Sequence, residues 1–313
     1  MVKILNTKQS DFQIKFDNLL KKRDKDDEKI DKIVSKIIYD VRKNSDNALL
    51  RLTNKLDKSN FKKIKDLIVK DSEFEKCFKD LASSTKFSLN KAISRIKSYH
   101  KKQMPKNIMY KDKEGVVLGG IWNPMESVGL YVPGGKAAYP SSLIMNAVPA
   151  IVAGVERIVV TVPAVNGETN SLVLACCKLL GINEVYKIGG AQAIAALALG
   201  TNTINKVDKI FGPGNAYVAS AKKQFFGTVG IDMIAGPSEV LVVADSKNNP
   251  DHIAIDLLAQ AEHDELAQSI LITDDKNFSE KVIKSINSLL EKLNRRKIAR
   301  SSWNNFGAVI ICD

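Results

Sequence analysis

The 313-residue chain is about twice the length of a typical single domain, and 44% of its residues are hydrophobic and 26% charged. This composition is typical of a globular protein with a sizeable core, and it excludes a disordered, collagen-like or fibrous chain. No stretch approaches the roughly 18 consecutive apolar residues of a membrane span, and the first 20 residues lack the apolar core of a signal peptide. We therefore expect a soluble cytoplasmic protein with no membrane partner.

The net charge of +12 comes entirely from the first third of the chain. Residues 1–113 contain 30 basic and 16 acidic side chains, whereas the rest of the chain contains 17 and 19. The basic part mixes both signs, as solvated helix faces do, and it lacks zinc-finger spacing and the pattern of an RNA-binding sheet. We expect no nucleic acid as a partner. The four cysteines have no CxxC spacing, which argues against a disulfide scaffold or a thiolate zinc site.

The first part of the chain is expected to be helical. Apolar residues recur at three- and four-residue steps between Ile30 and Val41, and segments 46–52 and 89–99 look similar. Pro105 ends this region, and residues 116–122 then have the composition of a strand.

From Val128 onward, short apolar runs alternate with helical segments. Strands are expected at 128–132, 157–162, 184–188, 207–211, 239–244, 269–273 and 308–312. Helices are expected between them, at 141–153, 168–180, 191–199, 215–226, 251–262 and 278–293. Such alternation is typical of βαβ units, in which helices cover both faces of a parallel sheet. We predict an α/β protein with two Rossmann-like parallel-sheet domains and an N-terminal helical segment.

The expected strands are too many for one small sheet, so we expect two domains with a seam at Gly236–Pro237. The first Rossmann-like domain is expected to comprise residues 1–130 and 239–313, to include the N-terminal helices and to be incomplete at its C-terminal end. Residues 131–238 are expected to form the second Rossmann-like domain.

Four glycine-containing turns are expected at the carboxyl ends of the strands, at 131–135, 188–192, 211–215 and 235–239. In an open parallel sheet, ligands bind at the carboxyl ends of the strands, where helix N-termini present free amides. Each turn alone is better explained as a tight connection, but several at equivalent places indicate a ligand site. None matches GxGxxG followed by an acidic residue, so the ordinary dinucleotide fingerprint is absent.

Gln260 and His263 are three residues apart near a helix end, so their side chains leave the same helical face. They offer one oxygen and one nitrogen ligand to zinc or a similar ion, but two ligands are not a site. Without further ligands, such a pair is more often part of a hydrogen-bonded helix end than of a metal site. No serine or cysteine has a base at motif spacing, so nucleophilic catalysis has little support.

Five sequence blocks together resemble the histidinol dehydrogenase family. They are GLYVPGG at 129–135, GGAQAIAALA at 189–198, KIFGPGN at 209–215, GPSEVL at 236–241 and QAEH at 260–263. The resemblance implies oxidation of L-histidinol, through enzyme-held L-histidinal, to L-histidine, the last steps of histidine biosynthesis. It also implies the reduction of two NAD molecules and one zinc ion, Zn(2+), per active site, which holds the substrate.

Matched position by position, the resemblance implies that Tyr131, Gln192 and Asn215 contact NAD, which makes residues 131–238 the NAD-binding domain. It implies that Ser238, Gln260 and His263 contact the substrate, and that Gln260 and His263 are also two of the zinc ligands. A homodimer is expected for the full-length protein.

The sequence departs from the family at its C-terminal end, Asp313. Family members continue with a Glu–His pair that performs the acid/base work, an Asp and a His that complete the zinc site, and small domains that reach into the partner subunit. No histidine follows His263 here, so the Glu–His pair is expected beyond Asp313. We therefore expect a truncated chain that has no catalytic acid/base residue of its own and little turnover. Two alternatives stay open: a related zinc and NAD enzyme that oxidises another alcohol, and a non-catalytic paralogue.

Overall fold

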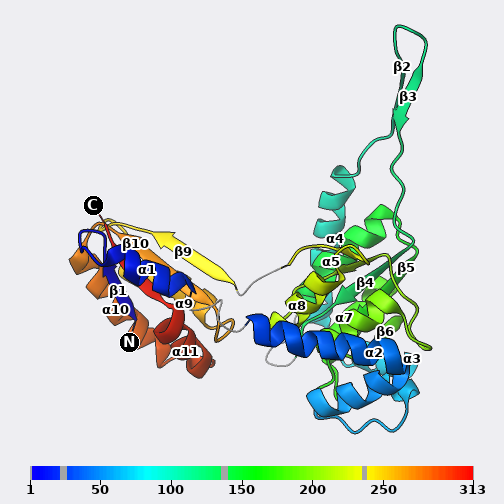
Figure 1. The fold of residues 1–313 in the computed structure, drawn as a ribbon, viewed down its shortest axis with the longest axis horizontal. Coiled ribbons are helices and arrows are strands. Elements are labelled where there is room, and N and C mark those ends of the chain that lie inside the picture. Colours follow the sequence, from blue (N-terminus) through cyan, green and yellow to red (C-terminus); the bar gives the residue numbers. More distant parts are fainter. Residues whose placement is uncertain (1, 22–26, 135–139, 235–237, 313) are drawn as a thin grey trace. The chain divides into compact units, whose positions relative to one another are not determined.

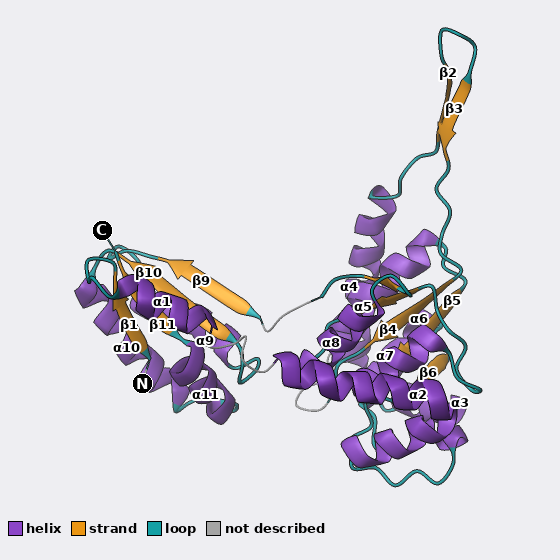
Figure 2. Ribbon diagram, in the orientation of Figure 1, coloured by secondary structure: helices purple, strands orange, loops and turns teal. Residues whose placement is uncertain are grey.

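The computed structural model describes residues 2–21, 27–134, 140–234 and 238–312, and the chain forms two compact units. Unit 1 comprises residues 1–28 and 235–313, and unit 2 comprises residues 29–234. Each unit contains its own parallel sheet with helices packed against it (Figure 1; Figure 2). The predicted α/β class with two Rossmann-like parallel sheets is confirmed.

The sheet of unit 1 has the order β1-β11-β10-β9, and all neighbouring strands are parallel. Its strands are β1 (Lys3–Asn6), β9 (Glu239–Val243), β10 (Gln268–Thr273) and β11 (Ala308–Ile311). Its helices are α1 (Phe12–Lys21), α9 (Pro250–Ala261), α10 (Lys276–Leu290) and α11 (Arg296–Phe306). Successive side chains of β10 face opposite sides: Leu271 packs with α9, α10 and α11, and Ile270 packs with α1. Both faces of the sheet are therefore covered by helices.

The sheet of unit 2 has the order β6-β5-β4-β7-β8 and is also entirely parallel. Its strands are β4 (Ser127–Tyr131), β5 (Arg157–Thr161), β6 (Glu184–Tyr186), β7 (Lys209–Phe211) and β8 (Gly230–Ile231). On one face lie α5 (Pro140–Ala153) and α6 (Ser171–Leu180), and on the other α7 (Gly190–Leu199) and α8 (Ala216–Phe225). Within this sheet the first strand along the chain is the central strand β4. The next two strands, β5 and β6, lie on one side of it, and β7 and β8 lie on the other, so a topological switch point falls between β4 and β7.

The N-terminal helices form an outer layer of unit 2. They are α2 (Asp27–Leu56), the 3-10 helix η2 (Ile64–Leu67), α3 (Asp71–Lys79) and α4 (Ser83–Lys102). Buried Val34 and Leu49 of α2 share a hydrophobic cluster with α7 and α8, and buried Phe74 of α3 shares one with α5 and α6. Ser45 interrupts α2 with a φ of 49°, and its hydroxyl accepts a hydrogen bond from the Asn202 N–H at 3.1 Å.

This division of the chain differs from the expected domain boundaries. Residues 29–130, which we expected in the first domain, belong to unit 2. The reason is that the apolar faces of α2, α3 and α4 close the two hydrophobic clusters on either side of the β4 sheet. The expected seam at Gly236–Pro237 lies outside the described residues.

A β-hairpin precedes β4 and consists of β2 (Ile108–Lys111) and β3 (Val117–Gly120), paired antiparallel with Ile108 opposite Gly120. The expected strand at 116–122 is thus the second arm of this hairpin. All residues of both arms are exposed. In Figure 1 the hairpin extends away from the sheet of unit 2. Within the described parts of the chain, no helix combines the length and the apolar composition needed to cross a bilayer.

Candidate functional site

Three of the predicted residues lie at the carboxyl edge of the unit 2 sheet. Tyr131 is the last residue of β4, Gln192 lies in the first turn of α7, and Asn215 is the N-cap of α8. Because the strands are parallel, the turns that lead from β6 into α7 and from β7 into α8 reach the same edge as the end of β4. The structure therefore brings Tyr131, Gln192 and Asn215 to the edge where ligands bind in such sheets.

Tyr131 connects two of these turns. Its hydroxyl accepts a hydrogen bond from the Gly190 N–H at 3.2 Å, and its backbone lies against Gly212, where an added Cβ would be 2.1 Å from the Tyr131 carbonyl oxygen. With a φ of +117°, Gly212 also adopts a conformation that favours glycine. Burial raises the pKa of Tyr131 to about 12. The charge of Asp57 also raises this pKa, whereas the hydrogen bond from Gly190 lowers it. The phenol is therefore neutral at physiological pH.

Gln192 is a buried polar side chain that lacks partners in the described parts of the chain. It is 1% exposed, and neither Oε1 nor Nε2 forms a hydrogen bond with the described residues. Gly189, at the N-cap of α7, has no side chain to cap the helix, and of the first helical N–H groups that of Gly190 donates to the Tyr131 hydroxyl. A buried amide without partners is costly unless a ligand satisfies it. A buried amide at a helix N-terminus, with no partner among the described residues, fits the polar groups of a dinucleotide.

The third turn, residues 212–215, is held at both ends. The Asn215 side chain accepts hydrogen bonds from the second and third N–H groups of α8, both at 3.1 Å. The Gly212 N–H donates to Asp232 at 2.9 Å, and its carbonyl accepts from Lys222 Nζ at 2.9 Å. Lys222 and Asp232 also form an ion pair, with the lysine side chain only 3% exposed. The turn is therefore fixed before any ligand arrives.

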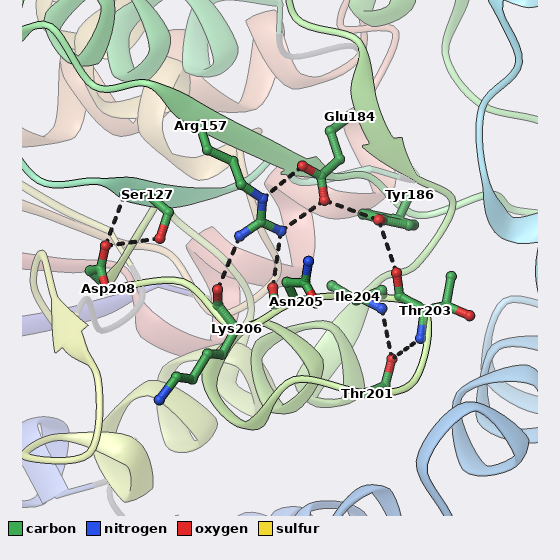
Figure 3. Close-up of polar contacts among 10 residues, drawn as sticks. All are labelled: Ser127, Arg157, Glu184, Tyr186, Thr201, Thr203, Ile204, Asn205, Lys206 and Asp208. Atoms are coloured by element: carbon green, nitrogen blue, oxygen red, sulfur yellow. Dashed lines mark hydrogen bonds and ion pairs between the residues drawn. The ribbon is translucent and has the colours of Figure 1, made fainter.

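The opposite, amino edge of this sheet carries a polar network that is closed on itself (Figure 3). The Arg157 guanidinium donates to both carboxylate oxygens of Glu184 at 2.8 and 2.9 Å, and to two loop carbonyls at 3.0 Å. The Tyr186 hydroxyl donates to Glu184 at 3.0 Å, and Ser127 donates to Asp208 twice at 2.8 Å. The hydrogen bond to Glu184 raises the pKa of Arg157. Because its charged groups satisfy one another, we interpret this edge as structural.

The other predicted residues, Ser238, Gln260 and His263, lie in unit 1. Ser238 directly precedes β9, and its carbonyl accepts a hydrogen bond from the Gln268 N–H at 3.0 Å. Gln260 lies in the last turn of α9, and His263 follows that helix with its N–H donating to the Gln260 carbonyl at 3.1 Å. All three therefore belong to the amino edge of the unit 1 sheet. The expectation that the turn at 235–239 lies at a carboxyl end is wrong for its described residues, because Ser238 directly precedes β9. The Gln260 Nε2 is buried and has no hydrogen-bond partner among the described residues.

Gln260 and His263 cannot form a zinc site by themselves. Protein zinc sites use three or four protein ligands, whereas these two residues offer one oxygen and one nitrogen. In the described part of the chain, no group of three or more His, Cys, Asp or Glu side chains could hold a metal ion. The described residues therefore support no chemical step through zinc.

The acid/base Glu–His pair is expected beyond Asp313, the last residue of the sequence. Asp313 itself lies outside the described residues, which end at Cys312 directly after β11. The structure therefore does not test the expectation that this chain has no catalytic acid/base residue of its own, and that expectation stays a prediction.

Asp57, directly after α2, is a candidate that no sequence pattern singles out. Its Oδ2 is buried without a hydrogen-bond partner among the described residues. Burial raises the pKa of this carboxyl, and hydrogen bonding to the backbone of Ala164 and Gly189 acts against that rise. Asp57 therefore lies beside the same turn that carries Gln192, although it precedes that turn by more than a hundred residues.

Known proteins resemble this chain along almost its whole length. A family model described as histidinol dehydrogenase matches residues 20–313. Histidinol dehydrogenase from Brucella suis biovar 1 (strain 1330) is 51% identical over 311 residues, which cover 99% of this chain and 72% of that protein. The enzyme from Rhodospirillum rubrum is 50% identical over 307 residues, 98% of this chain and 70% of that protein. The crystal structure of histidinol dehydrogenase from Elizabethkingia anophelis matches with a TM-score of 0.83 and 32% identity, covering 99% of this chain and 70% of that one. The chain belongs to the histidinol dehydrogenase family.

Proposed function

We propose that this chain carries the cofactor and substrate scaffold of an NAD-dependent, zinc-containing oxidoreductase that converts L-histidinol through L-histidinal to L-histidine. Membership of the family supports the reaction. The observation that supports the cofactor site is the buried amide of Gln192 at the carboxyl edge of the unit 2 sheet, which has no hydrogen-bond partner among the described residues. Homodimer formation, which the family resemblance implies, belongs to the same proposal.

Unit 2 is assigned the binding of NAD, which accepts hydride when it is bound. Gln192 offers one donor and one acceptor to the cofactor, and Asn215 ends the turn that Lys222 and Asp232 hold in place. Tyr131 stays neutral and holds the Gly190 turn through its hydroxyl. These residues bind and orient the cofactor, and none of them has to move a proton.

Unit 1 is assigned the binding of the substrate through Ser238, Gln260 and His263. A carboxamide oxygen and an imidazole nitrogen are both suitable donors to zinc, so the last two residues are also assigned to the metal. Oxidation of an alcohol also needs a base for the hydroxyl proton. No histidine follows His263 in these 313 residues, so we expect ligand binding rather than turnover from this chain alone.

Calorimetric titration with NAD tests the cofactor site. We expect saturable binding by the wild-type chain and at least about tenfold weaker binding by Gln192→Met, because the lost amide hydrogen bonds are worth about 1 kcal/mol or more each. The same variant should melt at a higher temperature, since it removes a buried amide without partners. Gln103→Met is the matched control, because Gln103 is an exposed residue at the end of α4. A wild-type chain that does not bind NAD would refute the proposal.

Titration with L-histidinol in the presence of zinc tests the substrate site. We expect His263→Ala to abolish zinc-dependent binding and His252→Ala, an exposed histidine near the start of α9, to preserve it. Stronger binding of an alcohol that lacks an imidazole would favour the related zinc and NAD alcohol dehydrogenases. If His263→Ala and His252→Ala bound L-histidinol equally, His263 would have no role in substrate binding, which would favour a non-catalytic paralogue.

A further inference from the structure

The first turn of α7 has no cap from its own sequence. Many helices begin with a side chain that accepts hydrogen bonds from the first free N–H groups, but the N-cap residue of α7 is Gly189. A side chain at this position would displace Pro163, because an added Cβ would lie 2.5 Å from its Cγ and 3.3 Å from its Cα. The loop after β5, to which Pro163 belongs, therefore packs directly against the backbone where α7 begins.

Side chains from two distant segments take the place of this cap. The Tyr131 hydroxyl, at the end of β4, accepts a hydrogen bond from the Gly190 N–H at 3.2 Å. The Asp57 carboxyl, directly after α2, is hydrogen-bonded to the backbone of Gly189 and Ala164. Both of these hydrogen bonds lower the pKa of the carboxyl, as donors to a carboxylate do. The dipole of α7 also favours a negative charge at this end of the helix.

The segment that carries Asp57 is attached to the loop after β5. The Asn166 N–H donates to the Asp57 carbonyl at 3.0 Å. The Ser59 hydroxyl donates to the Ala164 carbonyl at 2.6 Å and accepts from the Gly167 N–H at 3.1 Å. These three hydrogen bonds fix the backbone position from which the Asp57 carboxyl reaches the start of α7.

The location of Gln192 depends on how this turn is held. Neither atom of its amide forms a hydrogen bond with the described residues, so no such bond fixes the side chain itself. Gln192 lies two residues after Gly190, in the first turn of α7, and its position therefore follows the backbone of that turn. A change in how α7 begins is carried directly to the amide that the proposed cofactor site uses.

We propose that Asp57 is a positioning residue of the cofactor site: its carboxylate caps α7 from outside that helix and thereby holds Gln192 where it meets NAD. The inference rests on the proposed function, because it assumes that Gln192 contacts the cofactor. It requires no contact between Asp57 and NAD. Loss of the carboxylate should loosen the start of α7 and weaken NAD binding. Asparagine, whose side-chain oxygen still accepts hydrogen bonds, should preserve most of both functions.

Hydrogen exchange without NAD, well below the thermal midpoint, tests the cap itself. We expect the amides of residues 189–192 to exchange about tenfold faster in Asp57→Ala than in the wild type, the typical effect of losing a cap or a hydrogen bond to a charged group. Asp57→Asn should stay within about threefold of the wild type. Asp80→Ala, which removes an exposed carboxylate after α3, is the control and should leave these rates unchanged. Equal acceleration in the 212–215 turn would show that Asp57 only supports unit 2 as a whole, and would overturn the proposal.

Calorimetric titration with NAD connects the cap to the cofactor. We expect Asp57→Ala to bind NAD about tenfold more weakly than the wild type, Asp57→Asn to recover to within about threefold, and Asp80→Ala to bind normally. Wild-type affinity in Asp57→Ala would overturn the inference and leave the proposed function intact. Failure of the wild type to bind NAD would overturn both.

Ser59→Ala keeps the inference testable if Asp57→Ala does not fold. It removes two of the three hydrogen bonds that attach this segment to the loop after β5, and it keeps the carboxylate. We expect about threefold weaker NAD binding and faster exchange at residues 189–192, because the Asp57 carboxyl is then held less firmly. NAD binding and exchange equal to those of the wild type would overturn the inference.

Discussion

Among the described glycines with positive φ, Gly212 is the one whose replacement by alanine should destabilise unit 2 most. The added Cβ would lie 2.1 Å from the carbonyl oxygen and 3.0 Å from the carbonyl carbon of Tyr131, and both are backbone atoms that cannot rotate away. The hydrogen bonds from the Gly212 N–H to Asp232 and from Lys222 to its carbonyl oppose a shift of the turn. A φ of +117° costs an alanine about 1–2 kcal/mol, and overpacking adds about 1–3 kcal/mol. We expect a total loss of about 2–5 kcal/mol.

Gly227→Ala is the matched control for this prediction. Gly227 has a φ of +92° with nothing within 4 Å of an added Cβ, so its replacement carries only the backbone cost of about 1–2 kcal/mol. Scanning calorimetry measures both variants. In a Trp122→Phe background, fluorescence of the remaining Trp303, which is buried in unit 1, reports separately on that unit. Equal losses in the two variants would refute the reasoning, because the contact with Tyr131 would then contribute nothing.

Three further outcomes are expected. Lys222→Met should lower the stability of unit 2 by about 3–5 kcal/mol in the same calorimetric assay, because it leaves Asp232 charged without its buried partner, and a loss below about 1 kcal/mol would contradict this. Burial raises the pKa of Asp57 above its ordinary 3.8, so its contribution to stability is present at low pH and is lost as pH rises through the folded-state pKa. In Asp57→Asn the melting temperature should therefore fall less with rising pH than in the wild type. The same dependence of melting temperature on pH in both proteins would contradict the raised pKa of Asp57. The 313-residue chain should bind NAD yet form no NADH from L-histidinol, so steady NADH formation would show that an acid/base group is present within it.

The alternation of strands and helices after Val128 was predictable because parallel strands buried on both faces are continuous apolar runs. Strand β1 was not, since its four residues pair with β11, some 300 residues away, and carry no pattern of their own. Helix α11 did carry a signal, because Ala299, Trp303 and Phe306 are buried at helical spacing among polar residues. The assignment of α2 to unit 2 depends on tertiary packing alone.

The glycine turns could be recognised from the sequence because their spacing relative to the strands fixes the edge at which they lie. The family resemblance supplied the individual residues, and the structure places Tyr131, Gln192 and Asn215 along that edge. Asp57 could not be predicted from the sequence, because only its contact with the loop after β5 brings it to the turn that carries Gln192. A site built from distant segments leaves no local pattern in any one of them.

The most direct test of a cofactor site in unit 2 is hydrogen exchange measured with and without NAD. We expect NAD to protect the amides of residues 131–134, 189–192 and 212–215 at the carboxyl edge of the sheet. The amides around Arg157 and Glu184, at the amino edge, should exchange at unchanged rates because their network is already closed. Protection confined to the amino edge, or none in unit 2, would contradict the assignment of this edge to NAD.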